Sequence, residues 1–144
     1  PEVLVLDDFS LGLDPGYRRL FVDYMREYAK AEDKTVFLTS HIIQDMERLV
    51  DDCIVMDYGK ILVQMPVEEL LGKFRRYTAQ VSEGFRMQDT DGIYNPSVIR
   101  QTLELFSMLP ETEVRVRLSL QGVADVQVEK VGLEDAFIGL TGKY

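Results

Sequence analysis

The apolar run Val3-Leu4-Val5-Leu6, which ends in Asp7-Asp8, is the feature of this chain that most restricts its fold. A strand that is apolar on both faces is typical of the middle of a parallel sheet with both faces covered. Apolar residues at helical spacing predict a helix over residues 16–31, and the stretch 35–38 predicts a second strand. A strand, a helix and another strand in this order indicate a parallel α/β fold.

The alternation of strands and helices continues to about residue 72. A second helix is predicted to carry five apolar residues inward: Ile42, Ile43, Met46, Leu49 and Val50. Two further strands, 53–56 and 61–63, are predicted to form a hairpin around Gly59, and Pro66 begins a short helix. We therefore expect residues 1–74 to form one α/β portion.

The pattern changes after residue 74, where we expect a smaller α+β appendage over residues 75–144. The clean alternation of apolar and polar residues over 113–120 predicts a strand, and Asn95-Pro96 predicts the start of a helix. The predicted elements are strands at 77–82, 113–120 and 126–131, and helices at 95–108 and 133–140.

Charge and composition exclude several classes of function. Lysine and arginine total 16 and aspartate and glutamate total 25, so the net charge of −9 argues against nucleic acid as a partner. No apolar run approaches the roughly 18 residues of a membrane-spanning helix, so direct membrane insertion is not expected. The single Cys53 excludes an internal disulfide and a cysteine zinc site, and favours a cytoplasmic setting. Because Pro1 is not a translation start, we expect a fragment of a longer protein, cut on its N-terminal side.

Polar side chains follow the predicted parallel strands at their carboxyl ends, where α/β sheets bind ligands. Asp7 and Asp8 end the first strand, and Ser40 and His41 end the second. Carboxylates in such a position can hold hydrated Mg²⁺, which prefers oxygen ligands, and a neutral histidine can orient a phosphate. These residues are therefore candidates for a magnesium and phosphate site, although an acidic pair at a strand end can also serve only to meet solvent.

Several stretches of the chain, in order, resemble the ATP-binding cassette (ABC) ATPases. Residues 3–15, VLVLDDFSLGLDP, resemble the Walker B and D-loop region of that family. Residues 35–41, TVFLTSH, resemble its switch-histidine strand, the H-loop, and residues 52–62 resemble the stretch that follows it. Residues 133–142, LEDAFIGLTG, resemble the C-terminus of bacterial exporter-type members. Residues 75–130 resemble the family only in their position, where its members usually carry a variable appendage.

The resemblance implies that residues 1–74 are part of a P-loop NTPase sheet, with ATP and Mg²⁺ as cofactors. It implies that Asp7 binds Mg²⁺ largely through water, that Asp8 polarises the attacking water, and that His41 contacts the γ-phosphate. The implied D-loop, at the nucleotide and the partner subunit, consists of Leu11, Gly12, Leu13 and Asp14. The implied partners are a second ATP-binding subunit, identical or different, and a separate membrane subunit of the transporter. The protein would then lie in the cytoplasm, peripheral on the inner face of the cell membrane.

Two departures from the family pattern bear on catalysis. Asp8 stands where the family has a glutamate, and its shorter side chain withdraws the carboxylate by about 1.5 Å. Phe9 replaces a proline, which loosens the turn after Asp8. We expect slow hydrolysis or none, with nucleotide binding retained, because misplacement of about 1 Å can lower a rate on the order of a hundredfold.

Two family motifs that lie upstream of Walker B are missing from this sequence. It contains neither a Gly-x-x-x-x-Gly-Lys-Ser/Thr loop nor a Leu-Ser-Gly-Gly-Gln signature. The first of these motifs cradles phosphates with its backbone amides. We therefore expect the fragment alone to bind MgATP poorly and to be inactive.

Two other classes of function stay open. A response-regulator receiver domain also has an acidic pair after its first strand, and a phosphoacceptor aspartate near the position of Asp57. It would leave His41 and the Gly-Leu-Asp-Pro stretch unexplained, and the hairpin predicted after Asp57 does not fit it. The second alternative is that residues 75–144 form a non-catalytic regulatory or partner-binding module.

Overall fold

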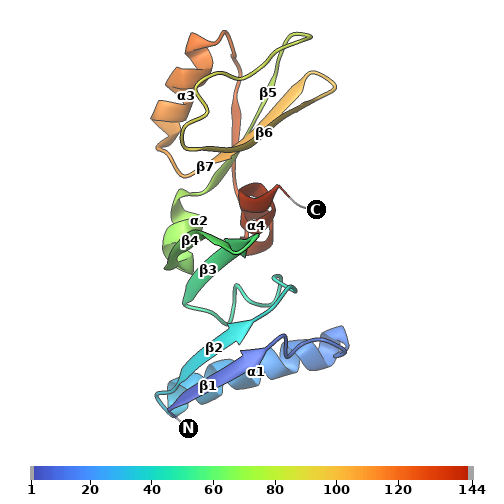
Figure 1. Cartoon of the computed structure of the whole chain (residues 1–144), viewed down its shortest axis with the longest axis vertical. Coiled ribbons are helices and arrows are strands. Elements are labelled where there is room, and N and C mark those ends of the chain that lie inside the picture. The colour runs from blue at the N-terminus through green and yellow to red at the C-terminus, as the bar shows by residue number, and fades with distance from the viewer. Residues whose placement is uncertain (1, 143–144) are drawn as a thin grey trace. The chain divides into compact units, whose positions relative to one another are not determined.

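The computed structural model describes residues 2–142, which form two compact units (Figure 1). Of the described residues, 2–51 belong to unit 1 and 52–142 to unit 2. Each unit mixes helices with strands in small sheets, so the α/β class is confirmed in this coarse form. Within residues 2–142, no helix combines the length and the hydropathy needed to cross a membrane. The domain boundary expected after residue 74 stays a prediction.

Unit 1 is built from a parallel strand pair and the helix that connects the two strands. Strand β1 (Val3–Asp7) pairs in parallel with β2 (Thr35–Thr39), in register from Val3 opposite Thr35 to Asp7 opposite Thr39. Helix α1 (Pro15–Ala31) is the crossover and runs along the strand pair (Figure 1). The predicted strand, helix and second strand are thereby confirmed.

Alternate residues of the strand pair differ in exposure. The half-buried apolar side chains are Leu4, Leu6, Val36 and Leu38. The exposed apolar side chains are Val3, Val5 and Phe37. We expected both faces of β1 to be buried. Residues 2–142 cover only the face of Leu4 and Leu6.

The second predicted helix, which was expected to carry Ile42, Ile43, Met46, Leu49 and Val50 inward, is wrong, because residues 44–49 form a series of turns. The Met46 amide donates to the Ile43 carbonyl, and the Leu49 amide to the Met46 carbonyl, each at 2.9 Å. Met46 is the residue of this segment that is fully buried, at 5% exposed. A segment this short needs a buried apolar face to stay helical, because isolated helices below about 12 residues are marginal.

Unit 2 begins with the predicted hairpin. Strands β3 (Asp52–Asp57) and β4 (Lys60–Pro66) pair antiparallel. Their turn is Tyr58-Gly59, with φ of +46° and +73°, and two left-handed residues in succession suit the twist of a tight hairpin. The short helix predicted from Pro66 is α2 (Val67–Lys73).

A four-stranded antiparallel sheet forms the larger part of unit 2, in the order β6-β7-β5-β8. Its strands are β5 (Arg75–Gln80), β6 (Ile93–Ile99), β7 (Thr102–Ser107) and β8 (Gln127–Lys130). Helix α3 (Glu111–Leu120) follows β7. One cluster of buried residues joins the sheet to α3 and the segment after it: Tyr77, Ala79, Leu103, Leu105, Val114, Leu118, Val123 and Val126. The strands predicted at 77–82 and 126–131 are confirmed as β5 and β8.

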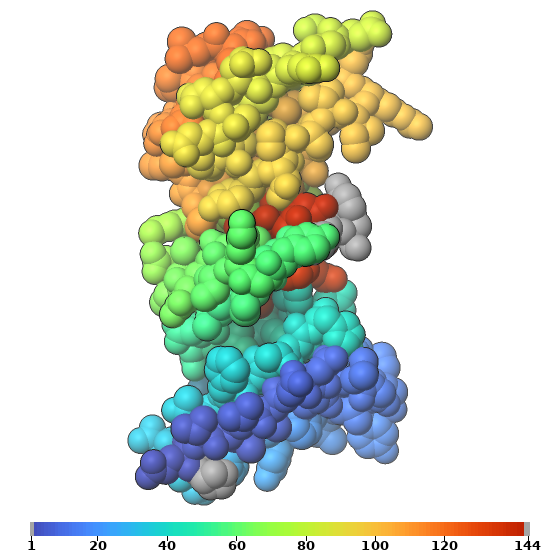
Figure 2. Space-filling view, in the orientation of Figure 1, coloured from blue at the N-terminus to red at the C-terminus, as the bar shows by residue number. Residues whose placement is uncertain are grey.

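The helix predicted over residues 95–108 is wrong, because this segment forms most of the β6–β7 hairpin. Its turn is Arg100-Gln101, with φ of +49° and +63°. Figure 2 shows the tip of this hairpin projecting from the body of unit 2. Asn95 caps no helix start; it lies at an irregularity in β6, with φ of +46°, and its side-chain amide donates to the Gly139 carbonyl at 2.6 Å.

The strand predicted over residues 113–120 is also wrong, because this segment lies in α3. Of its alternating apolar residues, Val114 and Leu118 are buried, whereas Val116 is 58% and Leu120 is 83% exposed. Buried residues four positions apart lie on one face of a helix. Glutamate–arginine ion pairs at the same spacing support the helix, at 2.8 Å for Arg115 and 2.7 Å for Arg117.

The last predicted helix is confirmed as α4 (Leu133–Thr141), which packs against α2, β6 and β7. A Cβ atom on Gly139 would lie 2.6 Å from Cδ1 of Phe106 and 2.9 Å from Cε1 of Phe74. Both phenylalanines are buried. The close approach of α4 to these rings therefore requires glycine at this position.

Candidate functional site

The candidate site lies within unit 1, at the carboxyl ends of β1 and β2. Asp7 is the last residue of β1, Thr39 is the last residue of β2, and the two are opposite each other in register. Asp8 and His41 follow these strand ends directly. Parallel pairing therefore brings together three side chains that the sequence singles out: Asp7, Asp8 and His41.

Thr39 is hydrogen-bonded to both aspartates. Its hydroxyl Oγ1 donates to Asp7 Oδ1. The Asp8 amide donates to the carbonyl oxygen of Thr39 at 3.0 Å and to Thr39 Oγ1 at 3.1 Å. One side chain on β2 therefore contacts the carboxylate of Asp7 and the backbone of Asp8.

Asp8 leaves β1 in a left-handed backbone conformation, with φ of +47°. Aspartate is among the residues that tolerate this region better than most non-glycine residues. A residue that precedes proline is instead held in an extended conformation. Phe9, in place of the proline implied by the resemblance, is therefore compatible with the backbone that Asp8 adopts.

The imidazole of His41 is paired with Asp8. His41 Nδ1 lies 2.8 Å from Asp8 Oδ1, and the two side chains are 60% and 39% exposed. An ionised carboxylate can only accept a hydrogen bond, so Nδ1 carries the hydrogen. In the neutral ring this leaves Nε2 as an acceptor.

The loop between Asp8 and α1 turns tightly. The Leu11 amide donates to the Asp8 carbonyl and the Leu13 amide to the Ser10 carbonyl, both at 3.2 Å. Gly12 has φ of +85°, a conformation that favours glycine. The side chains of Leu11 and Leu13 are 67% and 38% exposed.

Asp14 is occupied in the structure as the N-cap of α1. Its Oδ1 accepts from the Gly16 amide at 2.9 Å and from the Tyr17 amide at 3.1 Å. Pro15 in the first turn completes this start of the helix. The carboxylate of Asp14 thus holds the helix end, while Asp7, Asp8 and His41 converge on one another.

Replacing Asp14 by alanine should weaken the start of α1 by about 1 kcal/mol, the usual cost of losing an N-cap. Amide hydrogen exchange in the first turn of α1 should then quicken by roughly fivefold, whereas Asp14→Asn should stay close to the original protein. Equal exchange in Asp14→Ala and Asp14→Asn would contradict the capping role.

The donor set suits a hydrated magnesium ion better than a metal held by the protein alone. Within residues 2–142, no group of three or more histidine, cysteine, aspartate and glutamate side chains could hold a metal. Mg²⁺ is commonly held by one or two carboxylates, with water and substrate phosphates completing its shell. Asp7 supplies one carboxylate of that kind, whereas the carboxylate of Asp8 is paired with His41.

Sequence reasoning missed Thr39 and two ion pairs that join α1 to the segment after His41. Arg18 Nε lies 2.9 Å from Asp45 Oδ2, and Arg48 Nη2 lies 3.3 Å from Asp23 Oδ1. The ion pairs have no signal in the sequence, because they join positions 25 or more residues apart. Thr39 could have been found, since it is the polar residue that ends the second predicted strand.

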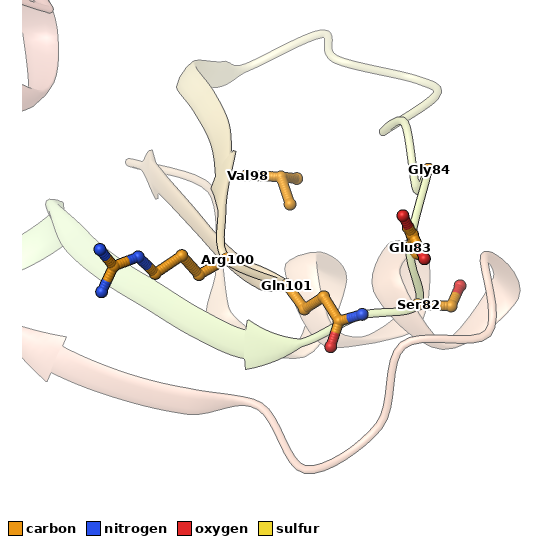
Figure 3. Close-up of a pocket in the computed structure, with 6 residues that line it drawn as sticks. All are labelled: Ser82, Glu83, Gly84, Val98, Arg100 and Gln101. Carbon is orange, nitrogen blue, oxygen red and sulfur yellow. The ribbon is translucent and has the colours of Figure 1, made fainter.

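Unit 2 offers a hollow, but it lacks converging polar groups (Figure 3). Its lining residues are Ser82, Glu83, Gly84, Val98, Arg100 and Gln101. The guanidinium of Arg100 points away from Glu83 and Ser82 (Figure 3). A binding site has polar groups that converge on the ligand, so the candidate site remains the one in unit 1.

Asp57 does not lie at the end of a parallel strand. It ends β3, pairs with Lys60 across the β3–β4 turn, and belongs to an antiparallel sheet. A receiver phosphoacceptor at the end of a central parallel strand is therefore not matched by this geometry.

Comparison with known proteins relates the whole chain to ATP-binding proteins of exporters. It is 33% identical over 156 residues to the Nod factor export ATP-binding protein I of Rhizobium sp. (strain N33), covering 99% of this chain and 48% of that protein. It is 31% identical over 152 residues to the protein of the same name from Rhizobium meliloti, covering 99% and 44%. It is 27% identical over 156 residues to the bacitracin transport ATP-binding protein BcrA of Bacillus licheniformis, covering 99% and 49%.

These matches include residues 75–130, which the motifs alone leave unassigned. The chain spans about half the length of the curated relatives it matches. No protein-family model matches the chain. The resemblance to ABC exporter ATP-binding proteins is thus confirmed as homology over part of their length.

Proposed function

From its homology to ABC exporter ATP-binding proteins, we propose that this chain is the C-terminal part of the ATP-binding subunit of an exporter-type ABC transporter. The observation that carries the proposal is the convergence of Asp7, Asp8 and His41 at one edge of a parallel strand pair. In this proposal residues 1–74 belong to a P-loop NTPase sheet and residues 75–144 are its appendage. The phosphate-binding loop and the signature motif are supplied by residues outside this sequence.

The residues of unit 1 have separate tasks in the proposed ATP hydrolysis. Bound MgATP supplies the phosphoryl group and much of the charge that must be stabilised. Asp7 would hold a water of the Mg²⁺ shell, and Thr39 fixes one of its carboxylate oxygens. Asp8 orients the ring of His41 through Nδ1, and Nε2 of His41 is the atom available to the attacking water and the γ-phosphate.

The exposed loop of Leu11, Gly12, Leu13 and Asp14 is proposed to meet a second ATP-binding subunit across the nucleotide. Exposed leucines on a tight turn are suited to contact with a partner surface. Closure of two such subunits on ATP would act on a separate membrane subunit. The complex would place this chain on the cytoplasmic side of the cell membrane.

Phosphate release by the full-length protein tests the proposal. Asp7→Asn should lower the residual rate by on the order of a hundredfold because it removes the carboxylate proposed to hold Mg²⁺, and His41→Ala should do so because it removes the ring proposed to contact the γ-phosphate. Asp33→Asn is the matched control, since Asp33 is an exposed turn residue whose left-handed φ asparagine tolerates. Unchanged hydrolysis in both site variants would contradict the proposal, and labelling of Asp57 by acetyl phosphate would favour the receiver alternative.

A further inference from the structure

We propose that Thr39 is a positioning residue that sets the geometry of Asp7, Asp8 and, through Asp8, of His41. The meaning of this role for catalysis rests on the proposed function. The geometric role itself concerns only residues of unit 1. It can be tested without nucleotide.

The first support is the number of contacts made by one hydroxyl. Thr39 Oγ1 donates its hydrogen to Asp7 Oδ1 and accepts the amide hydrogen of Asp8 at 3.1 Å. A hydroxyl can donate and accept at the same time, and this one does both. The parallel register, with Thr39 opposite Asp7, places it between the two aspartates.

The second support is that the Asp8 backbone needs to be held. Its φ of +47° lies in a region that non-glycine residues occupy infrequently. The Asp8 amide donates to two oxygen atoms of Thr39, the carbonyl oxygen at 3.0 Å and the hydroxyl oxygen. This fixed backbone directs the Asp8 carboxylate to His41 Nδ1, 2.8 Å away.

The third support is the exposure of the site. Asp7 and Thr39 are exposed, and the His41 side chain is 60% exposed, so packing alone does not hold these side chains. Hydrogen bonds must then determine their orientation. Thr39 ties one oxygen of Asp7 and leaves the other for a metal-bound water, which fits a magnesium site of the outer-sphere kind.

The tautomer of His41 reports this arrangement directly. His41 is the single histidine of the chain, so its ring nitrogens give unambiguous signals in ¹⁵N NMR spectra. At a pH where imidazole is neutral, the original chain should show His41 mainly as the Nδ1–H tautomer. In Thr39→Val, the ratio of Nε2–H to Nδ1–H should rise by roughly fivefold, the equivalent of about one hydrogen bond.

Two further variants separate positioning from general structure. Thr39→Ser keeps the hydroxyl and should restore the original tautomer ratio. Thr35→Val is the matched control, because Thr35 lies on the same strand and its side-chain hydroxyl makes no hydrogen bond within residues 2–142. Amide spectra of each variant establish that the fold is kept, and Thr39→Ala replaces Thr39→Val if the valine variant does not fold.

An unchanged tautomer ratio in the folded valine or alanine variant would overturn the proposal. So would an equal change in Thr35→Val, because the effect would then belong to the strand and not to the hydroxyl. The experiment contains no ATP, so either outcome is independent of whether the full-length protein hydrolyses it.

Discussion

Gly139→Ala is expected to lower the free energy of unfolding of unit 2 by about 2 kcal/mol. The added Cβ would lie 2.6 Å and 2.7 Å from two ring atoms of Phe106 and 2.9 Å from the ring of Phe74. These rings are buried and stacked on each other at 5.7 Å, so they have little freedom to move. Overpacking of this kind typically costs roughly 1–3 kcal/mol, and the very short contacts here favour a value near the top of that range. Alanine also has a higher helix propensity than glycine, which offsets about 1 kcal/mol of this cost.

Amide hydrogen exchange in the whole chain measures this effect in unit 2 alone. The slowest amides of β5 and β7 report its global unfolding, and their exchange should quicken by about thirtyfold in Gly139→Ala. Gly72→Ala is the matched control, because Gly72 also lies in a helix and a Cβ there would meet no atom within 4 Å. Its exchange should be unchanged or slower, and equal protection in the two variants would contradict the close packing of α4.

The double change of Asp8→Glu with Phe9→Pro is expected to raise ATP turnover of the full-length protein by on the order of a hundredfold. The longer side chain of glutamate moves the carboxylate about 1.5 Å closer to the attacking water. Proline holds the preceding residue extended, whereas Asp8 has φ of +47°. The two departures from the family pattern are therefore physically linked, and reversing both should place the longer carboxylate better than reversing one.

The single changes test this link. Asp8→Glu alone should raise turnover less, because glutamate is less suited than aspartate to a left-handed backbone. Phe9→Pro alone should break the contact between Asp8 and His41 and lower turnover. Phe9→Ala is the control for the lost ring, which lies 4.9 Å from the ring of Phe21. Turnover of the double variant no higher than that of the original protein would contradict the argument.

Elements whose pattern is set by local contacts were predictable from the sequence. β1, α1 and β2 follow from a two-faced apolar run, an N-cap with proline and a second apolar run. The hairpin at Gly59 follows from its turn residues. Such signals lie within a few residues of the structure that they specify.

Elements whose pattern is ambiguous were not predictable. Residues 113–120 alternate as a strand would, but Val116 and Leu120 are exposed, and tertiary packing of Val114 and Leu118 selects a helix. Asn95-Pro96 resembles a helix start, yet Asn95 lies at an irregularity of β6 and bonds to Gly139, 44 residues away. Long-range contacts of this kind are not visible in a local pattern.

The convergence of Asp7, Asp8 and His41 could be predicted from the sequence, but the part of Thr39 and the geometry of the site could not. Asp7, Asp8 and His41 were singled out because strand ends of a parallel sheet meet at one edge. The contact between Asp8 and His41, the left-handed turn at Asp8 and the role of Thr39 depend on the strand register. Register depends on the pairing of the strands in the sheet, so a motif in one strand does not predict it.

The proposal that this chain is the C-terminal part of an ABC ATP-binding subunit is tested most directly by reading the coding sequence upstream of Pro1. The account predicts an in-frame Gly-x-x-x-x-Gly-Lys-Ser/Thr loop followed by a Ser-Gly-Gly motif, both before Val3. These motifs would supply the phosphate cradle that Asp7, Asp8 and His41 require. A stop codon or a start codon directly upstream, with neither motif present, would contradict the account.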